Sequence, residues 1–390
     1  MTKKSDAPAI RFKGFSDAWE QRKLGEIGSV SMCRRIFKEQ TSETGDIPFY
    51  KIGTFGADPD AFISRELFEE YKSKYPYPQK GDILISASGS IGRTVEFAGN
   101  NEYFQDSNIV WLNHDERLSN PFLKCFYSVV KWAGIEGSTI KRLYNDNILN
   151  TVICMPSVPE QKRIGLFFEN LDNLITLHQR KFEKLTNVKK SMLEKMFPQN
   201  GSSYPEIRFK GFTDPWEQRK VSDLAEKTYG GGTPTTSNEA YWNGDIPWIQ
   251  SSDVVDGKLL GVEPRKWITQ DGLNNSAAQL IPGNSIAIIT RVGVGKLAFM
   301  PYSYATSQDF LSLSKLNAEP LFTVYACYKK LQSELNAVQG TSIKGITKDE
   351  LLAKNIMVPR YAEQQQIGAF FKQLDNLITL HQRELEKLQN

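Results

Sequence analysis

The chain has 390 residues, which is enough for two domains that each bury a core of their own. Its 48 basic and 45 acidic residues leave a formal charge of only +3, so total charge gives no argument for a nucleic-acid partner, and any basic surface must come from local clustering. The sequence shows no signal peptide and no stretch that approaches a membrane span, and its four cysteines stand singly. We therefore expect a cytoplasmic protein with reduced thiols and no membrane partner.

The second half of the chain restates parts of the first. Three segments recur unchanged: Ile10–Phe15 as Ile207–Phe212, Trp19–Lys23 as Trp216–Lys220, and Leu171–Arg180 as Leu374–Arg383. Between these borders the copies have diverged, and the distance between equivalent positions grows from 197 to 203 residues, so the second centre is six residues longer. A long repeat with fixed borders and divergent centres indicates one scaffold that carries two different surfaces.

Each divergent centre predicts mixed structure, in the same order along the chain. A short apolar segment, 82–85 in the first copy and 285–289 in the second, predicts a buried strand. A turn rich in small residues follows each strand, and Gln105-Asp106 aligns with Gln308-Asp309. Amphipathic helices are then expected at 122–132 and 321–335.

Both copies end in a long helix with apolar residues at intervals of seven, which predicts a coiled-coil seam. The first helix, 160–197, would be roughly 57 Å long at 1.5 Å per residue. The second stops at Asn390, which aligns with Asn187, so it is either truncated or naturally shorter. Because the two helices have equal phase, we expect them to pair with each other in an antiparallel arrangement. The predicted seam positions are Ile164, Leu171, His178, Leu185, Met192, Ile367, Leu374, His381 and Leu388.

Two histidines, His178 and His381, occupy the same seam position in the two copies. A polar residue in a seam commonly fixes the register of the helices, whereas a metal site would need further ligands nearby. We expect no catalytic residue, no cofactor and no metal in this chain.

The predicted fold class is α+β, with two mixed α/β domains separated by two long antiparallel coiled-coil helices in a pseudo-twofold internal repeat. The boundaries follow from the repeat: a border segment 1–24, a first divergent domain 25–158, a central helix 159–198, a linker and second border 199–221, a second divergent domain 222–361 and a C-terminal helix 362–390.

Basic and hydroxyl side chains gather in the loops of the divergent domains, where they could contact a nucleic acid. Arginine and lysine reach base edges or phosphates, and serine and threonine bind phosphate oxygens. The alternative is that these side chains are solvated surface charges. Trp242, Trp248 and Trp267 could likewise add aromatic surface to such a site or be core aromatics. The candidates are Arg34, Arg35, Lys38, Ser88, Ser90, Arg93, Lys141, Arg142, Thr233, Arg291, Lys296 and Lys344.

Two enzyme motifs also need consideration. Asp60, Glu70 and Lys72 have the outline of a Mg²⁺-dependent nuclease site, but the second copy has no counterpart. Residues 293–296 match only the end of a phosphate-binding loop, because Thr290 stands where the first Gly belongs and Leu297 stands where a Mg²⁺-binding Ser or Thr belongs. A metal nuclease and a protein-interaction scaffold therefore remain as alternatives to a nucleic-acid reader.

Several motifs occur twice and in the same order: Trp-Glu-Gln-Arg-Lys, Gly-Asp-Ile-Pro, Glu-Gln-x-x-Ile-Gly-x-Phe-Phe and Leu-Asp-Asn-Leu-Ile-x-Leu-His-Gln-Arg. Together with Gly-Gly-Thr-Pro in the second copy, they resemble the specificity subunit of Type I restriction–modification enzymes over essentially the full chain. The first copy departs from the pattern, with Ser31–Arg35 in place of Gly-Gly-Thr-Pro.

The resemblance implies a non-catalytic subunit that reads an asymmetric, bipartite double-stranded DNA target. Each divergent domain would be a target-recognition domain for one half-site, and the two helices would set the spacing. The implied partners are two methyltransferase (M) subunits and two restriction motor-nuclease (R) subunits, which would hold S-adenosylmethionine, ATP and Mg²⁺.

Overall fold

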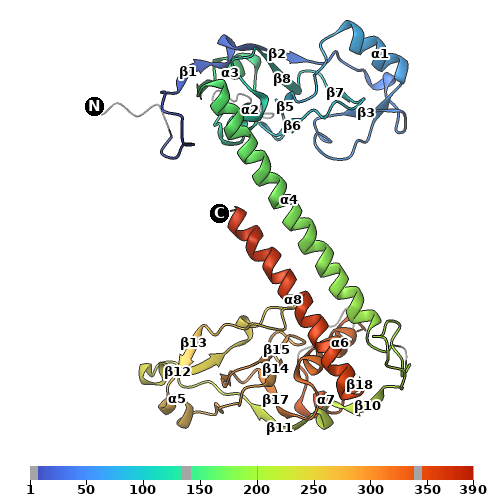
Figure 1. The fold of residues 1–390 in the computed structure, drawn as a ribbon, viewed down its shortest axis with the longest axis vertical. Coiled ribbons are helices and arrows are strands. Elements are labelled where there is room, and N and C mark those ends of the chain that lie inside the picture. Colours follow the sequence, from blue (N-terminus) through green and yellow to red (C-terminus); the bar gives the residue numbers. More distant parts are fainter. Residues whose placement is uncertain (1–7, 133–141, 200, 338–344, 390) are drawn as a thin grey trace. The chain divides into compact units, whose positions relative to one another are not determined.

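The computed structural model describes residues 8–132, 142–199, 201–337 and 345–389 (Figure 1). The chain divides into two compact units, Met1–Leu174 and Ile175–Asn390. We call them unit 1 and unit 2.

Three sheets form in the described part of unit 1. An antiparallel sheet has the order β2-β8-β5-β6, a mixed sheet has the order β4-β3-β7, and β1 pairs with β9. Their bounds are β1 Glu20–Lys23, β2 Gly28–Met32, β3 Ile47–Tyr50, β4 Phe62–Ile63, β5 Ile83–Ser86, β6 Thr94–Glu96, β7 Tyr103–Phe104, β8 Ile109–His114 and β9 Val152–Met155. The helices that begin in this unit are η1 Leu24–Glu26, η2 Lys38–Gln40, α1 Arg65–Lys74, α2 Asn120–Val129, α3 Asn145–Asn150 and α4 Val158–Lys195.

Unit 2 repeats these connections strand for strand. Its sheets have the orders β11-β17-β14-β15 and β13-β12-β16, and β10 pairs with β18. The strands are β10 Glu217–Lys220, β11 Ala225–Gly230, β12 Trp242–Ile249, β13 Lys266–Ile268, β14 Ser285–Ile289, β15 Leu297–Met300, β16 Ala305–Thr306, β17 Phe310–Leu316 and β18 Asn355–Val358. The helices are η3 Val221–Leu224, η4 Glu239–Tyr241, η5 Ser251–Asp253, α5 Gln270–Asn274, α6 Pro320–Ala337, α7 Lys348–Leu352 and α8 Tyr361–Gln389.

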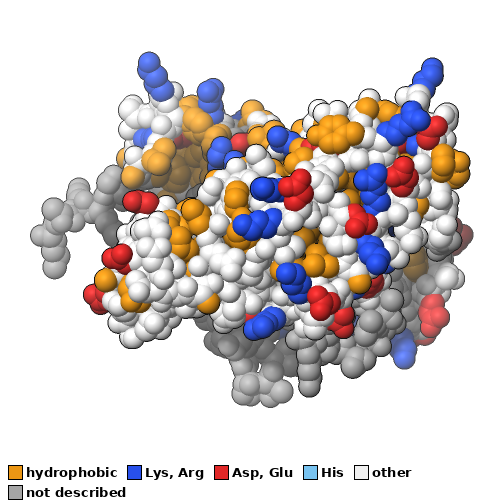
Figure 2. Space-filling model, turned by 90° about the horizontal axis from the view of Figure 1, so that it is seen from below, with side chains coloured by type: hydrophobic (Ala, Val, Ile, Leu, Met, Phe, Trp, Pro, Cys, Tyr) orange, Lys and Arg blue, Asp and Glu red, His pale blue; other side chains and the backbone are white. Residues whose placement is uncertain are grey.

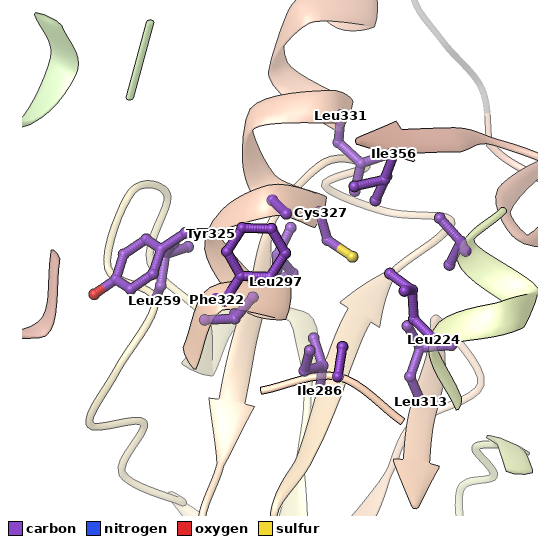
Figure 3. Close-up of a cluster of buried hydrophobic side chains, with 14 of the residues drawn as sticks. Leu224, Leu259, Ile286, Leu297, Leu313, Phe322, Tyr325, Cys327, Leu331 and Ile356 are labelled. Carbon is purple, nitrogen blue, oxygen red and sulfur yellow. The ribbon is translucent and has the colours of Figure 1, made fainter. Parts of the chain in front are cut away.

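The apolar segments that predicted strands form the centres of the two larger sheets. Every residue of β5 and of β14 is buried, as expected for strands covered on both faces. In unit 1, α2 covers β5 and β6, and in unit 2, α6 packs against β14, β15 and α8. Figure 3 shows side chains of α6, including Phe322 and Leu331, above Ile286 of β14 and Leu313 of β17. The predicted α+β class with repeated mixed domains is confirmed.

Each long helix is held to its domain by the residues that recur in the border segments. The Arg11 guanidinium donates to both oxygens of buried Glu160 at 2.6 and 2.7 Å, and Arg208 donates to both oxygens of Glu363 at 2.8 Å. These carboxylates lie in the first turns of α4 and α8, where the helix dipole also favours negative charge. The repeated border thus fastens the start of a helix in each unit.

Two glycines allow these helices to start close to a neighbouring helix. A Cβ at Gly165 of α4 would lie 2.3 Å from Cβ of Pro121 in α2, and a Cβ at Gly368 of α8 would lie 2.9 Å from Leu321 in α6. Only glycine permits such a close approach. The motif Ile-Gly-x-Phe-Phe therefore marks the helix–helix contact in each unit.

Within unit 2, α4 and α8 run antiparallel. His178 meets His381, Lys189 pairs with Asp375, and Phe197 just after α4 packs on Phe371, so contacts move backward along α8 as they move forward along α4. The predicted antiparallel pairing is confirmed.

The predicted seam residues do not all have the same surroundings. Leu185 and Met192 pack with Ile367 and Leu374 in the core of unit 2. Ile164 instead packs on the core of unit 1 formed around α2, because the first turns of α4 cover that domain. Leu171 and Leu388 are half-buried. The apolar heptad positions of α4 therefore pack on the core of unit 1 at the start of the helix, and they pack against α8 only further along.

Candidate nucleic-acid interface

In unit 1, three segments far apart in sequence meet at the turn that follows β5. The Ser88 hydroxyl donates to Asn108 Oδ1 at 2.8 Å, and the Leu143 amide donates to the Ala87 carbonyl at 2.8 Å. The Arg142 guanidinium donates to the Ser107 carbonyl at 3.0 Å. We call this set of segments, 86–93, 105–108 and 142–143, the first loop cluster.

A fourth segment joins the same cluster through side chains. The Arg93 guanidinium donates to the Gly56 carbonyl at 2.9 Å, and the Ile52 amide donates to Gln105 Oε1 at 2.8 Å. The Ser90 carbonyl accepts from the Ser86 hydroxyl, which closes the turn on itself. Predicted residues Ser88, Ser90, Arg93 and Arg142 are thus gathered at one place.

The structure places the other predicted cations of unit 1 differently. The guanidinium of Arg34 stacks over the Tyr75 ring at 5.3 Å, that of Arg35 stacks over the Phe37 ring at 5.6 Å, and Lys38 lies in η2. All three side chains are exposed on the segment that follows β2. Lys141 and Lys344 lie outside the described residues.

Unit 2 builds the same kind of cluster on the turn after β14. The Thr290 amide donates to the Asp309 carbonyl at 2.8 Å, and the Ile346 amide donates to the Thr290 carbonyl at 2.8 Å. The Thr233 hydroxyl donates to Gln308 Oε1 at 2.6 Å, which adds the Gly-Gly-Thr-Pro loop. We call the segments 231–233, 290–296, 306–309 and 345–346 the second loop cluster.

The Gly-Gly-Thr-Pro loop is packed without space for side chains at its glycines. A Cβ at Gly231 would lie 1.8 Å from the Ser307 carbonyl oxygen, and one at Gly232 would lie 2.2 Å from the backbone of Ala277. The Trp248 indole donates to the Gly232 carbonyl at 3.0 Å and so holds the loop in place. These contacts set the position of Thr233 beside Gln308.

The two clusters share a scaffold but present different chemistry. Arg291 stands 203 residues after Ser88, and Lys296 stands 203 residues after Arg93, at equivalent places in the two turns. Arg291 is exposed and Lys296 half-buried. A hydroxyl in unit 1 is therefore matched by a guanidinium in unit 2, and these groups prefer different partners on a base edge.

One sequence equivalence is wrong. The sequence match pairs Gln105 with Gln308, but the Gln105 amide donates to the last carbonyl of β3, and in unit 2 the Ser307 amide makes the corresponding bond to the last carbonyl of β12. The carbonyl that accepts from the turn amide belongs to Asn108 in unit 1 and Asp309 in unit 2. A local change in loop length shifts the register, which a match of two residues cannot detect.

Residues that the sequence did not indicate as nucleic-acid contacts complete both clusters. Asn108, Ser107 and Gln105 hold the first cluster together, and Gln308 holds the second. Lys266 lies over the Trp242 and Trp248 rings at 5.6 and 5.9 Å. The position of Gln105, Ser107, Asn108 and Gln308 just before the buried strands β8 and β17 is the sequence pattern that could have identified them.

The residues of the nuclease alternative each have another partner. Asp60 pairs with Lys51 at 2.8 Å and Glu70 pairs with Lys74 at 2.9 Å, while the Lys72 ammonium lies over the Phe68 and Tyr77 rings. In the parts of the chain that the structure describes, no three His, Cys, Asp or Glu side chains are grouped as metal ligands. The phosphate-loop pattern at 293–296 runs into strand β15 rather than the helix N-terminus that binds phosphate.

Burial also raises the pKa of thiols and phenols in both units. It raises the pKa of Cys33 and of Cys327 to about 12, and it raises the pKa of Tyr304 to about 12. A thiolate is the nucleophilic form of cysteine, so these two thiols are inert at neutral pH.

Charged side chains of both signs are interspersed on the face shown in Figure 2. In Figure 2, Lys and Arg side chains lie next to Asp and Glu side chains over the face in view. Neither sign of charge covers this face alone, in agreement with the small net charge. Among the described helices, none has both the length and the apolar character needed to cross a bilayer.

Comparison with known proteins places this architecture in a family. The sequence pattern of the Type I restriction modification DNA specificity domain matches residues 16–187 and again 213–390. A specificity subunit of Haemophilus influenzae is 61% identical over 157 residues, which cover 39% of this chain and 41% of that protein. The MjaX specificity subunit of Methanocaldococcus jannaschii is 23% identical over 95% of this chain and 90% of its own length.

A solved structure has the same fold. The S subunit of a Type I restriction–modification system from M. genitalium matches 97% of this chain and 94% of its own, with a TM-score of 0.61 at 14% identity. With the family pattern matched twice and the same sheet orders built twice, the chain belongs to the family of Type I restriction modification DNA specificity domains.

Proposed function

We propose that the chain is a non-catalytic specificity subunit that reads a bipartite, asymmetric DNA sequence with one domain per half-site. The observation that carries this proposal is the construction of one loop cluster twice on the same scaffold with different side chains. A shared scaffold sets position, and unlike side chains select unlike bases. The domains 25–158 and 222–361 would then each read one half of the target.

The proposed partners are double-stranded DNA, two methyltransferase subunits and two motor-nuclease subunits. The paired helices α4 and α8 would dock the methyltransferase subunits. S-adenosylmethionine, ATP and Mg²⁺ would be bound by those partner subunits. The names of the relatives support this proposal, because they describe specificity subunits of Type I restriction enzymes.

Exchange of one recognition domain tests the proposal. Residues 25–155 are replaced by the corresponding segment of another family member, and methylated adenines are mapped in cells that contain the methyltransferase subunits. We expect one half of the modified sequence to change and the other half to remain. The matched control replaces residues 222–358, for which the opposite half should change.

Two results would reject the proposal. If both halves or neither half changed, the domains would not read half-sites independently. If the assembled complex bound no DNA in a sequence-dependent manner while the exchanged chain still folded, the loop clusters would instead be surfaces for protein partners.

A further inference from the structure

The two seam histidines form a direct pair between α4 and α8. Nδ1 of His178 lies 3.0 Å from Nδ1 of His381, and the ring centroids are 5.1 Å apart. The residues occupy equivalent positions in the repeat, 203 residues apart. In a twofold arrangement, only a residue on the axis meets its own counterpart. The local twofold axis of the helix pair therefore passes through this contact.

The separation of the two nitrogens suits a bound metal ion. Transition metals bind imidazole nitrogen at about 2.0–2.1 Å, so two nitrogens at a right angle around one ion are about 2.9 Å apart, and two at a tetrahedral angle about 3.3 Å apart. The observed 3.0 Å lies between these values. The two nitrogens are at hydrogen-bonding distance from each other, so a shared ion would take the place of the proton that lies between them.

We propose that His178 and His381 form a two-nitrogen binding site for a late first-row transition-metal ion such as Cu²⁺, Ni²⁺ or Zn²⁺. Both rings are half-buried, so water can complete the coordination shell on the exposed side. The proposal departs from the sequence-based expectation of no metal, because water rather than further side chains would complete the ligand shell. It rests on the geometry of the helix pair and not on the proposed function.

The surroundings select the kind of ion. The Lys181 side chain places a positive charge close enough to His381 to act on that ring electrostatically. The Lys181 ammonium also repels a cation, so the ion must gain its affinity from bonds to imidazole. Cu²⁺, Ni²⁺ and Zn²⁺ do so, whereas Mg²⁺ and Ca²⁺ prefer oxygen ligands.

A bound ion would link α4 to α8 directly. It would stabilise the helix pair by mass action, since it binds the paired state and not the separated helices. Because the described residues contribute two ligands and no group of three, the site is exchangeable rather than a closed structural site.

Cu²⁺ titration of the full chain tests the proposal, with electron paramagnetic resonance used to count the coordinated nitrogens. We expect one equivalent to bind with two imidazole nitrogens and to raise the melting temperature. His178→Gln and His381→Gln should each leave one nitrogen and weaken binding by roughly 100-fold or more, because even changes outside the ligand shell cost about 10–100-fold.

His114→Gln is the matched control, since His114 contacts Asn120 and the Asp115 carbonyl in unit 1. It should leave affinity and nitrogen count unchanged. Circular dichroism establishes that each variant is folded, and glutamine retains a polar side chain at the seam. Absence of saturable binding, two-nitrogen binding that persists in both seam variants, or loss of binding in His114→Gln would each overturn the proposal.

Discussion

The buried arginine–glutamate pairs show how a few residues of a repeated motif can fix a helix to its domain. Arg208 and Glu363 satisfy each other with two parallel hydrogen bonds, and Glu363 is almost fully shielded from water. Removal of one partner leaves the other charge buried without compensation, which costs far more than the pair itself contributes. The Ile-Arg-Phe-Lys-Gly-Phe repeat is thus explained by the carboxylate that it must reach.

We predict that Arg208→Ala destabilises unit 2 by about 3 kcal/mol, because it isolates the Glu363 carboxylate. Hydrogen exchange of unit 2 peptides, monitored by mass spectrometry, measures the local free energy of opening. The control is Arg219→Ala, which removes an exposed ion pair with Glu217 and should cost less than about 0.5 kcal/mol. Equal effects of the two changes would show that the border arginine has no special role.

A second prediction concerns the Gly-Gly-Thr-Pro loop. Gly231→Ala should displace Thr233, because the new Cβ would collide with the Ser307 carbonyl. This overpacking should destabilise unit 2 by about 1–3 kcal/mol. If the proposed function holds, methylation of the target DNA should then be lost, because the second half-site would not be read. Gly230→Ala is the control, since a Cβ there has no atom within 4 Å. Methylation assays on both variants test this prediction. Equal activity of the two variants would show that this loop does not take part in reading the DNA.

At the scale of elements, the two long helices differ in their surroundings although their sequences match. Asp375 of α8 accepts from the Tyr325 hydroxyl at 2.6 Å and pairs with Lys189 of α4. Its equivalent in unit 1, Asp172, is exposed. One carboxylate therefore connects α4, α6 and α8, whereas the same residue in the other copy faces solvent.

This difference gives a matched test of the helix pairing. Asp375→Asn should destabilise unit 2 by about 3 kcal/mol, since the buried Lys189 ammonium loses its carboxylate partner and retains the hydrogen bond to the Gly257 carbonyl. Asp172→Asn should leave stability unchanged. Urea unfolding followed by hydrogen exchange in α8 provides the measurement. An equal effect at both positions would mean that the ion pair does not stabilise the contact between α4 and α8.

For the whole molecule, a net charge of +3 limits how strongly the surface can attract DNA. Affinity must depend on particular cations, of which Arg291 in the second loop cluster is exposed. Each phosphate contact contributes about 0.9 to the slope of log affinity against log salt concentration.

Arg291→Ala should therefore lower that slope by about 0.9 if the guanidinium binds a phosphate, and leave the slope unchanged but relax base preference if it binds a base edge. Fluorescence anisotropy of labelled DNA over a range of salt concentrations distinguishes the two roles. Lys387→Ala, which removes a cation paired with Glu384 on α8, serves as the control and should change neither quantity. An Arg291 variant that behaves like this control would place the DNA elsewhere.

The sequence by itself determined the repeat, the buried central strands and the two long helices of equal phase. These features leave a local signature, because burial imposes a period of apolar residues and a duplicated scaffold repeats its anchors. Arg11, Glu160 and their counterparts could be marked as important from the repeat alone, although their pairing could not.

Only the tertiary structure decided which loops meet. Ser88 is joined to Asn108 by a side-chain hydrogen bond and to Arg142 by a backbone bridge. These segments are far apart in the chain, and no local period records such contacts. The true equivalent of Gln105, the packing of Ile164 on a domain core and the meeting of His178 with His381 depend on the same long-range geometry. Periodicity reports that a residue is buried, whereas the partner that buries it is chosen by the fold.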